Sequence, residues 1–373
     1  MKNYDIIVIG AGPGGSAAAK TAAENGYSTC FFEKESLREG GRYKACGGAI
    51  AWELVEEIKY PEEKISRIIE SLELHHIDGE TFSKNGKGAV VWRSEFDKYV
   101  TDLAMEAGAK LNDNEKLINI QKSNGSYQIE TNKGQYQAKY VIAADGVTST
   151  TLNLLKWPFF ESKDTILTIT QEMRTSQEDI KQSLGSDKVH LFFGIKDFIT
   201  VGYAWLFPKK ETITVGWGNQ INLIKNSREE FQKFRNLSFV KNALKNSELD
   251  VFKPHLIPVG LRSKLYDENV FAVGDVTTLA VTDTISIPKA GVFAEGEAIT
   301  VAKNIISKIQ SNKESLLFDG KGVCFIESGR NTASLIEVDM FSGTKPSTKL
   351  TTSTTKHLDE KIQFEKERFT KWL

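Results

Sequence analysis

The sequence predicts an α/β protein with a nucleotide-binding unit at its N-terminus, and three features support this prediction. Residues Asp5 to Gly15 read DIIVIGAGPGG and open with an apolar, β-branched run, which is typical of a strand buried on both faces. Gly10, Gly12 and Gly15 then follow with the spacing G-x-G-x-x-G. After an alanine-rich helix, a second strand, TCFFEK, carries the acidic residue Glu33 near its end. This order is typical of a Rossmann-like βαβ unit that binds a dinucleotide.

Each residue of this unit has a physical role in the prediction. Gly10 allows the tight turn after the strand, Gly12 lets the backbone approach a pyrophosphate, and Gly15 lets the helix pack closely on the strand. Pro13 fits the first turn of the helix, where its missing N–H does no harm. Glu33 lies 23 residues after Gly10, and a carboxylate there accepts hydrogen bonds from a ribose 2′-hydroxyl. We therefore expect an ADP moiety without a 2′-phosphate.

Length and composition restrict the class of protein. The chain has 373 residues, enough for two or three domains, and its 48 basic and 49 acidic residues leave a net charge of −1. This balance argues against a nucleic-acid partner. Three cysteines, Cys30, Cys46 and Cys324, are too few for a disulfide framework and indicate a reducing compartment. No signal peptide or membrane-spanning run is recognisable, so we expect a cytoplasmic protein.

The sequence favours a flavin over a nicotinamide as the resident cofactor. No second strand–G-x-G-x-x-G–helix unit follows the first one, which favours one tightly held FAD. Asp145 follows the predicted hairpin 127–144, and Asp275 ends the predicted strand 269–275. Both patterns are also compatible with simple turns, but we favour carboxylates that face ribityl or ribose hydroxyls. Gly291 and Val292 begin an apolar helix whose first amides can face the flavin ring.

Four further segments carry a resemblance to a known family. They are RYKACGGAI (42–50), the R-x-x-F-D pattern that starts at Arg93, YAWLFP (203–208) and HLIPVG (255–260). With the N-terminal unit, they resemble the geranylgeranyl reductase family, within the p-hydroxybenzoate hydroxylase-like flavoproteins. YAWLFP is the most specific of these segments, and the resemblance extends from residue 1 to about residue 275.

The resemblance implies reduction of isolated C=C bonds in isoprenoid chains, with FAD as cofactor. It implies a Rossmann-like FAD-binding domain built from discontinuous segments, 1–150 and 261–310, with a β-rich substrate domain (α+β) inserted at 151–260. We expect residues 311–373 to form a C-terminal hairpin and an amphipathic helix. The resemblance implies FAD contacts at Gly15, Glu33, Cys46, Gly48, Arg93, Asp275, Gly291 and Val292. A further backbone contact near Leu117 follows from spacing alone.

Three residues are candidates for the chemistry. Cys46 lies in a glycine-rich loop, where it is either an inert buried thiol or, as we favour, a packing group or proton donor beside the flavin. Tyr203 and Trp205 alternate along a strand and therefore project to one face. They are either core residues or, as in the family, the lining of a long apolar slot. The histidines other than His75 and His76 are isolated in sequence, and we expect no metal site.

The C-terminal part is less typical of the family. Beyond Asp275 the sequence is more similar to sulfide:quinone oxidoreductase-like flavoproteins, so a quinone-linked enzyme with Cys324 as a redox cysteine is the alternative. A chain that binds FAD without turnover is a third possibility. The segment from Leu358 is predicted to be an amphipathic helix that docks on its own protein or contacts a membrane surface peripherally. The expected partners are an isoprenoid lipid and an external electron donor, such as ferredoxin or reduced nicotinamide.

Overall fold

The strands and helices of this chain divide into two units, each drawn from three separate stretches of sequence. The computed structural model describes residues 1–37, 43–76, 79–194, 198–260, 262, 264–277, 279, 291–311, 315–329, 332–341 and 347–360. Unit 1 comprises Met1–Tyr43, Ser94–Asp164 and Ile257–Gly320, and unit 2 comprises Lys44–Arg93, Thr165–Leu256 and Lys321–Leu373.

Unit 1 is built around a mixed eight-stranded sheet. Its main path runs β15-β16-β9-β1-β2-β6, and the hairpin β7–β8 joins it through β8 and β9. The strands are β1 (Lys2–Ile9), β2 (Thr29–Phe32), β6 (Lys110–Asn112), β7 (Leu117–Ser123), β8 (Ser126–Thr131), β9 (Gln135–Ala143), β15 (Tyr266–Asp267) and β16 (Val270–Ala272). β1 pairs in parallel with β2 and β9, and β16 adds in parallel to β9. This parallel arrangement confirms the predicted Rossmann-like fold.

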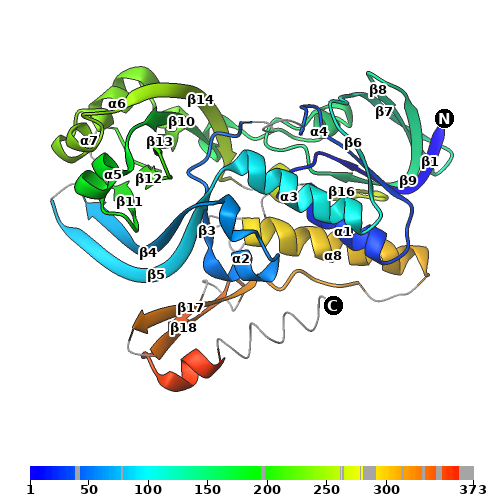
Figure 1. Cartoon of the computed structure of the whole chain (residues 1–373). Helices are drawn as coiled ribbons and strands as arrows, with labels where there is room; N and C mark the ends of the chain where they lie inside the picture. The colour runs from blue at the N-terminus through cyan, green and yellow to red at the C-terminus, as the bar shows by residue number, and fades with distance from the viewer. Residues whose placement is uncertain are drawn as a thin grey trace. The chain divides into compact units, whose positions relative to one another are not determined.

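The central strand β1 is buried on both faces because its apolar residues alternate between two cores. Ile6 and Val8 belong to one hydrophobic cluster and Ile7 and Ile9 to another. The helices of unit 1 are α1 (Pro13–Glu24), α3 (Arg93–Glu106, of which Arg93 belongs to unit 2), α4 (Thr150–Leu154) and α8 (Gly291–Ile309), with short 3₁₀ turns at Ser162–Asp164 and Gly274–Val276. Figure 1 shows α1, α3 and α8 side by side, and all three contribute to the cluster that contains Val8.

Unit 2 contains a second eight-stranded sheet in the order β14-β10-β13-β12-β11-β4-β5-β3. Its strands are β3 (Ala49–Ala51), β4 (Ile65–His76), β5 (Thr81–Val91), β10 (Thr165–Arg174), β11 (Lys188–Phe193), β12 (Ala204–Pro208), β13 (Thr212–Gln220) and β14 (Glu248–Pro258). Its helices are α2 (Trp52–Glu57), α5 (Gln177–Leu184), α6 (Ser227–Arg235) and α7 (Ser238–Ala243), with 3₁₀ turns at Glu62–Lys64 and Ile221–Leu223. β4 and β11 pair in parallel, whereas β11, β12, β13 and β10 form an antiparallel run.

The two faces of this second sheet differ in chemistry. One face carries Leu206, Val215 and Trp217, which pack with residues of α5, α6 and α7 into a single apolar cluster. Figure 1 shows these three helices gathered at β10–β13. Because side chains alternate along a strand, Trp205 and Phe207 of β12 project to the opposite face. The helices therefore bury one face, and the other carries the predicted site residues.

Residues 44–93 and 151–164 lie in a different unit from the one that the sequence analysis assigned to them. Residues 44–93 were expected within the continuous segment 1–150, yet they belong to unit 2, because β4 pairs with β11 and the hairpin β4–β5 extends that sheet. The C-terminal stretch also belongs to unit 2, where β17 (Lys321–Gly329), β18 (Thr332–Asp339) and β19 (Ser347–Leu350) form an antiparallel sheet. A helix begins at residue 355, and its expected apolar residues beyond 360 lie outside the described residues. Among the described helices, none combines the length and the hydropathy needed to span a bilayer.

The packing of Gly15 gives a testable prediction for the fold. A Cβ at this position would lie 1.9 Å from the carbonyl oxygen of Gly10, so Gly15→Ala forces α1 away from the turn. We expect a loss of about 1–3 kcal/mol in the free energy of unfolding, measured by chemical denaturation. Gly86→Ala is the matched control, because no atom lies within 4 Å of its added Cβ. Equal stability of the two variants would contradict the packing role of Gly15.

Candidate active site

The turn between β1 and α1 has the geometry that a pyrophosphate needs. Gly10 has φ +107°, and a Cβ there would lie 2.3 Å from the carbonyl oxygen of Ala144. Gly12 is the N-cap of α1, where no side chain caps the helix and no acidic residue lies in the first turn. The first N–H groups of α1 and the positive end of its dipole are therefore available to an anionic group.

Glu33 lies close to this turn, and the strand that begins at Leu117 follows a residue bonded to Glu33. The buried Glu33 carboxylate accepts hydrogen bonds from the amide of Ala11 at 3.2 Å and from the amide of Glu35 at 3.1 Å. The backbone of Glu33 also accepts a bond of 2.8 Å from Glu115, two residues before the buried Leu117 at the start of β7. The strand end thus fixes a carboxylate beside the glycine turn, as a ribose-binding residue requires.

Asp145 has a different environment from the one expected. Its carboxylate accepts hydrogen bonds from the Ser149 hydroxyl at 2.5 Å, the Thr151 amide at 2.9 Å and the Thr151 hydroxyl at 3.0 Å. Burial raises the pKa of this carboxyl group, and these hydrogen bonds oppose the rise. Both oxygens are therefore engaged at the start of α4, and Asp145 shapes the loop beside Gly10 rather than presenting a free carboxylate.

Asp275 is the better placed of the two candidate carboxylates. It lies half-buried in the 3₁₀ turn after β16, and none of the described residues donates a hydrogen bond to its carboxylate. The turn is held by Glu297 of α8, whose Oε2 accepts from the Gly274 amide at 3.0 Å and from the Thr277 hydroxyl at 2.8 Å. Glu297 is only 7 % exposed. Sequence analysis missed Glu297, although a glutamate on the apolar side of a helix was the available signal.

The remaining predicted residues of unit 1 lie at the start of α8. Gly291 and Val292 form its first turn, but their side chains are not described, and Pro288 and Ala290 lie outside the described residues. The uncapped N-terminus of α1, the carboxylate of Glu33 and the carboxylate of Asp275, which has no donor among the described residues, together fit a bound FAD.

In unit 2, the loop that carries Cys46 packs directly on β12. A Cβ at Gly47 would lie 2.3 Å from Cδ2 of Phe207 and 3.2 Å from Nε1 of Trp205. Gly48 has φ +80°, and a Cβ there would lie 2.1 Å from the carbonyl oxygen of Val91. Cys46 is a free, half-buried thiol, while Arg42 of the same predicted motif lies outside the described residues. The glycines therefore provide the close backbone approach that the sequence indicated.

Tyr203 and Trp205 lie on the same face, as their spacing predicts. Their ring centroids are 5.5 Å apart. The Trp205 indole covers Gly216 of β13, where a Cβ would lie 1.9 Å from Cε2 of the indole. Trp205 is 6 % exposed, and its Nε1 has no hydrogen-bond partner within the described part of the chain. Burial raises the pKa of Tyr203, and the nearby Cys46 adds to the rise, so the phenol keeps its proton at neutral pH.

Polar groups also occur on this face of the sheet. Thr170 of β10 is paired with Gly216, so Thr170, Gly216 and Trp205 form one row across three strands. The fully buried Thr170 Oγ1 has no hydrogen-bond partner among the described residues, like the indole N–H of Trp205. Arg93 begins α3 and is half-buried.

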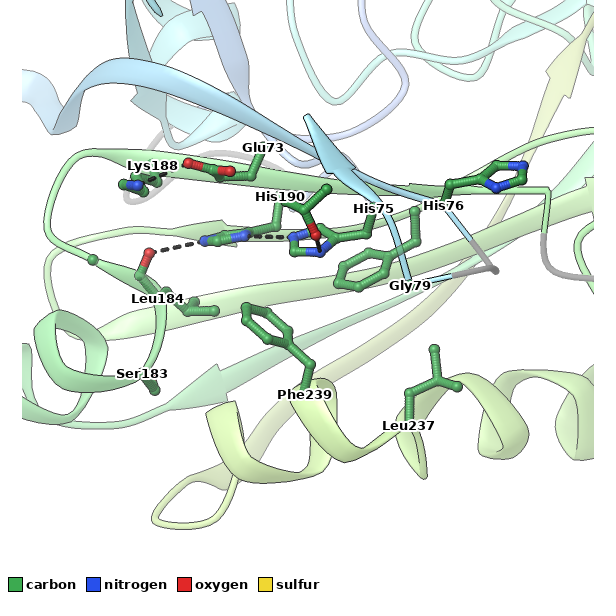
Figure 2. Close-up of a pocket in the computed structure, with 13 residues that line it drawn as sticks. Glu73, His75, His76, Gly79, Ser183, Leu184, Lys188, His190, Leu237 and Phe239 are labelled. Carbon is green, nitrogen blue, oxygen red and sulfur yellow. Dashed lines mark hydrogen bonds and ion pairs between the residues drawn. The ribbon is translucent and has the colours of Figure 1, made fainter. Parts of the chain in front are cut away.

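A separate cavity of about 650 Å³ lies on the opposite face of the unit 2 sheet. Figure 2 shows His75 and His190 at its centre, with Phe239 beside them and the Glu73–Lys188 ion pair nearby. His190 pairs with Leu206, the neighbour of Trp205 along β12, so the cavity and the Trp205 row are on different faces. The full lining is Glu73, His75, His76, Gly79, Thr81, Ser183, Leu184, Gly185, Lys188, His190, Phe192, Leu237 and Phe239.

The two histidines of this cavity form a hydrogen-bonded pair that the sequence analysis did not predict. His190 Nε2 lies 2.8 Å from the carbonyl oxygen of Leu184, and a carbonyl only accepts, so Nε2 carries the proton. His190 Nδ1 then accepts from His75 Nε2 at 2.9 Å. Burial lowers the pKa of both, that of His190 to about 4. His190 is therefore not isolated, as its place in the sequence suggested, but the described residues contain no group of three or more candidate metal ligands.

Comparison with known proteins identifies the family. Residues 4–154 match the pyridine nucleotide-disulphide oxidoreductase family model. The chain is 30 % identical over 322 residues to digeranylgeranylglycerophospholipid reductase of Methanocaldococcus jannaschii, an alignment that covers 82 % of this chain and 77 % of the relative. The same-named protein of Methanococcus vannielii is 30 % identical, with 74 % and 70 % of the two chains covered. The chain belongs to the geranylgeranyl reductase family.

A solved structure agrees with this geranylgeranyl reductase assignment. The geranylgeranyl bacteriochlorophyll reductase-like protein of Thermoplasma acidophilum has a TM-score of 0.70 and 25 % identity, with 83 % of this chain and 80 % of that chain covered. The predicted family, the α/β fold, the oxidoreductase class and the FAD cofactor are thereby confirmed. These relatives give no support to the predicted similarity of the C-terminal part to sulfide:quinone oxidoreductases.

The position of Glu297 predicts an effect on cofactor affinity. Glu297→Ala removes the acceptor of the Gly274 and Thr277 hydrogen bonds and frees the turn that presents Asp275. We expect FAD to bind at least about tenfold more weakly, measured by flavin fluorescence during titration of the apoprotein. Glu297→Gln keeps a carbonyl acceptor and is expected to fall between the parent and the alanine variant. An affinity that is unchanged by the alanine substitution would contradict this role.

The histidine pair predicts a loss of stability in acid. The pKa of His190 is about 4 in the folded chain, below the value of about 6.5 for an unfolded histidine. Between these values the unfolded state binds more protons, so stability falls as pH falls from about 6.5 towards 4. The contribution is at most about 3 kcal/mol.

Chemical denaturation at several pH values in this window measures the effect. His190→Gln, which keeps a donor for Leu184, is expected to flatten the pH dependence relative to the parent protein. His76→Gln is the control, because His76 lies beside Gly194 and outside the pair. Parallel pH profiles for the parent and the His190 variant would contradict the prediction.

Proposed function

We propose that this protein reduces isolated C=C bonds in a geranylgeranyl or related isoprenoid chain, carried by a membrane glycerophospholipid, with FAD as cofactor. The single observation that carries the proposal is the buried indole of Trp205, with the ring of the more exposed Tyr203 beside it and the Cys46–Gly48 loop packed on it. The names of the two relatives described above, both digeranylgeranylglycerophospholipid reductases, support the same substrate class.

The proposed FAD ligands follow from the geometry of each unit. In unit 1, the N-terminus of α1, with Gly10, Gly12 and Gly15, binds the pyrophosphate. The carboxylate of Glu33 accepts hydrogen bonds from the ribose, and that of Asp275 accepts one from a hydroxyl of the ribityl chain. The family resemblance adds Leu117, Gly291 and Val292 of unit 1 and Cys46, Gly48 and Arg93 of unit 2. Asp145 positions its loop through Ser149 and Thr151.

The chain must supply positioning and a proton for this reaction. When bound, the reduced flavin supplies the hydride for one alkene carbon. An isolated alkene has no carbonyl to polarise it, so a dry apolar surface that fixes the isoprenoid chain contributes most of the rate. The buried ring of Trp205 is the proposed centre of this surface, and the ring of Tyr203 lies beside it. Cys46 is the proposed proton donor to the other carbon, with the protonated phenol of Tyr203 as the second candidate.

Two partners follow from this proposal. An electron donor must reduce the flavin, and because the sequence contains one dinucleotide-binding unit, we infer an external donor such as ferredoxin or reduced nicotinamide. The lipid substrate requires access to a membrane surface. The predicted C-terminal amphipathic helix would provide peripheral contact through its apolar face.

The function can be tested by single turnover. The purified flavoprotein is reduced anaerobically with dithionite and mixed with vesicles that contain digeranylgeranylglycerophospholipid, or with free geranylgeraniol. We expect flavin reoxidation together with a gain of two hydrogens per reduced bond in the phospholipid, read by mass spectrometry. Saturation of the free alcohol alone would reject the phospholipid. Reoxidation only by quinone, with sulfide as reductant, would overturn the proposal in favour of the quinone-linked alternative.

Two cysteine variants separate these readings further. Cys46→Ala is expected to slow saturation about 10²-fold, measured per bound FAD, through loss of the proton donor. Cys324→Ala is the control, because Cys324 pairs with Ile336 in the β17–β18 hairpin and has no part in the proposed reaction. A greater loss from Cys324→Ala than from Cys46→Ala would favour the quinone-linked alternative.

A further inference from the structure

A fully buried ion pair lies on the same face of the unit 2 sheet as Trp205. Lys209 follows β12, and its Nζ lies 3.2 Å and 3.1 Å from the two carboxylate oxygens of Glu172 on β10. The side chains are only 2 % and 1 % exposed. The ammonium also donates to the hydroxyl of Thr214, which in turn donates to Glu172 at 2.8 Å. The ammonium group is thus held by two neighbouring strands.

The strand register places this ion pair next to the Cys46 loop. Glu172, Thr214 and Phe207 form one row across β10, β13 and β12, directly beside the row that contains Trp205. Gly47 packs on the ring of Phe207 in that row.

A second connection between Lys209 and the loop runs through Trp92. The ring of Trp92 lies 4.0 Å from Nζ of Lys209, and the preceding residue, Val91, donates a backbone hydrogen bond of 2.9 Å to Gly48. The loop therefore contacts Phe207, which lies in the row of Glu172, and it bonds to the residue before Trp92, whose ring contacts Lys209. The pKa of Lys209 agrees with this placement: burial lowers it, while Glu172 and then the charge of Cys46 oppose that change.

Stability alone does not account for this arrangement. A buried ion pair carries a desolvation cost that its Coulomb attraction seldom exceeds, and apolar residues of similar volume often serve equally well. Arg67 additionally fixes the backbone of Lys209, with Nε and Nη2 donating to its carbonyl oxygen at 2.9 Å and 2.6 Å. The structure thus holds the Lys209 ammonium, paired with Glu172, in a fixed place beside the loop that carries Cys46.

We propose that Lys209, held by Glu172, is a positioning residue that stabilises the thiolate formed when Cys46 protonates the substrate. This inference rests on the proposed function. In the step, the S–H bond of Cys46 breaks and a C–H bond forms at one alkene carbon. The other carbon takes the hydride that the reduced cofactor supplies, so the π bond is lost and both electrons come from the cofactor. Solvent water then returns a proton to Cys46, and neither Cys46 nor Lys209 changes oxidation state.

The first test measures thiol reactivity without any substrate. In a Cys324→Ala background the remaining cysteines are Cys46 and the fully buried Cys30, whose pKa burial raises to about 12. Alkylation of Cys46 by iodoacetamide at one fixed pH is followed by mass spectrometry of its peptide. The double variant Lys209→Met, Glu172→Gln removes both charges, and we expect it to react about tenfold more slowly. A rate equal to that of the parent would overturn the proposal.

Two further variants guard against a trivial loss of folding. Lys209→Arg keeps the charge and is expected to react at the parent rate. Thr214→Val removes two hydrogen bonds but no charge, and it is expected to react at the parent rate as well. Circular dichroism must show that each variant is folded. If the double variant does not fold, the alkylation rates of Lys209→Arg and Lys209→Gln are compared instead. Only the glutamine variant is expected to slow alkylation of Cys46.

A second test uses the reaction itself and separates this proposal from the proposed function. Cys46→Ala combined with Lys209→Met, Glu172→Gln is expected to saturate the lipid no more slowly than Cys46→Ala alone, because Lys209 acts through Cys46. Additive losses would show a purely structural role for Lys209 and overturn the inference. If the parent saturates the lipid but the alkylation rates are equal, only this inference fails; if the parent does not saturate it, the proposed function fails.

Discussion

The absence of a side chain at Gly47 and Gly216 is the constraint on which the candidate substrate surface depends. The indole of Trp205 lies over Gly216 on β13 and beside Gly47 of the Cys46 loop, and a Cβ at either glycine would overlap a neighbouring ring. Dense packing of this kind leaves few alternative positions for a large rigid ring. The same approach brings the loop onto Phe207, in the row that contains the Lys209–Glu172 ion pair. One aromatic position thus fixes the thiol, the charge and the apolar surface together.

Local signals in the sequence were sufficient where one short stretch determines the structure. The glycine turn, the end of β2 at Glu33 and the alternation of Tyr203 with Trp205 all depend on neighbouring residues, and each has the predicted geometry. Pairing between distant strands was not predictable from a single sequence. His75 and His190 are 115 positions apart and meet only because β4 and β11 pair in parallel. The same pairing draws residues 44–93 into unit 2, which no composition change in the sequence indicated.

Asp145 and Asp275 illustrate how far a two-residue motif can be interpreted. Both follow buried parallel strands and stand beside a glycine. The carboxylate of Asp145 nevertheless accepts from three donors within the chain. The carboxylate of Asp275 has no donor among the described residues, and a third carboxylate, that of Glu297, holds its turn. The difference arises from the residues that follow each strand. After β9, Ser149 caps α4 and Thr151 lies in its first turn, whereas a 3₁₀ turn follows β16. Which carboxylate remains free is therefore a tertiary property.

The discontinuous origin of unit 1 has a consequence for how the chain acquires its structure during synthesis. Its first helix, α1, packs at Gly14 against Ala294 of α8, and its central sheet receives β16 only from the stretch 257–320. A nascent chain that has emerged only as far as β14 therefore lacks both the outer strand and the helix that bury the N-terminal glycine turn. Until the ribosome adds them, apolar surface of α1 remains exposed and vulnerable to aggregation, and contacts between such distant stretches form slowly. The cofactor cradle is thus encoded first but is completed among the last parts of the fold.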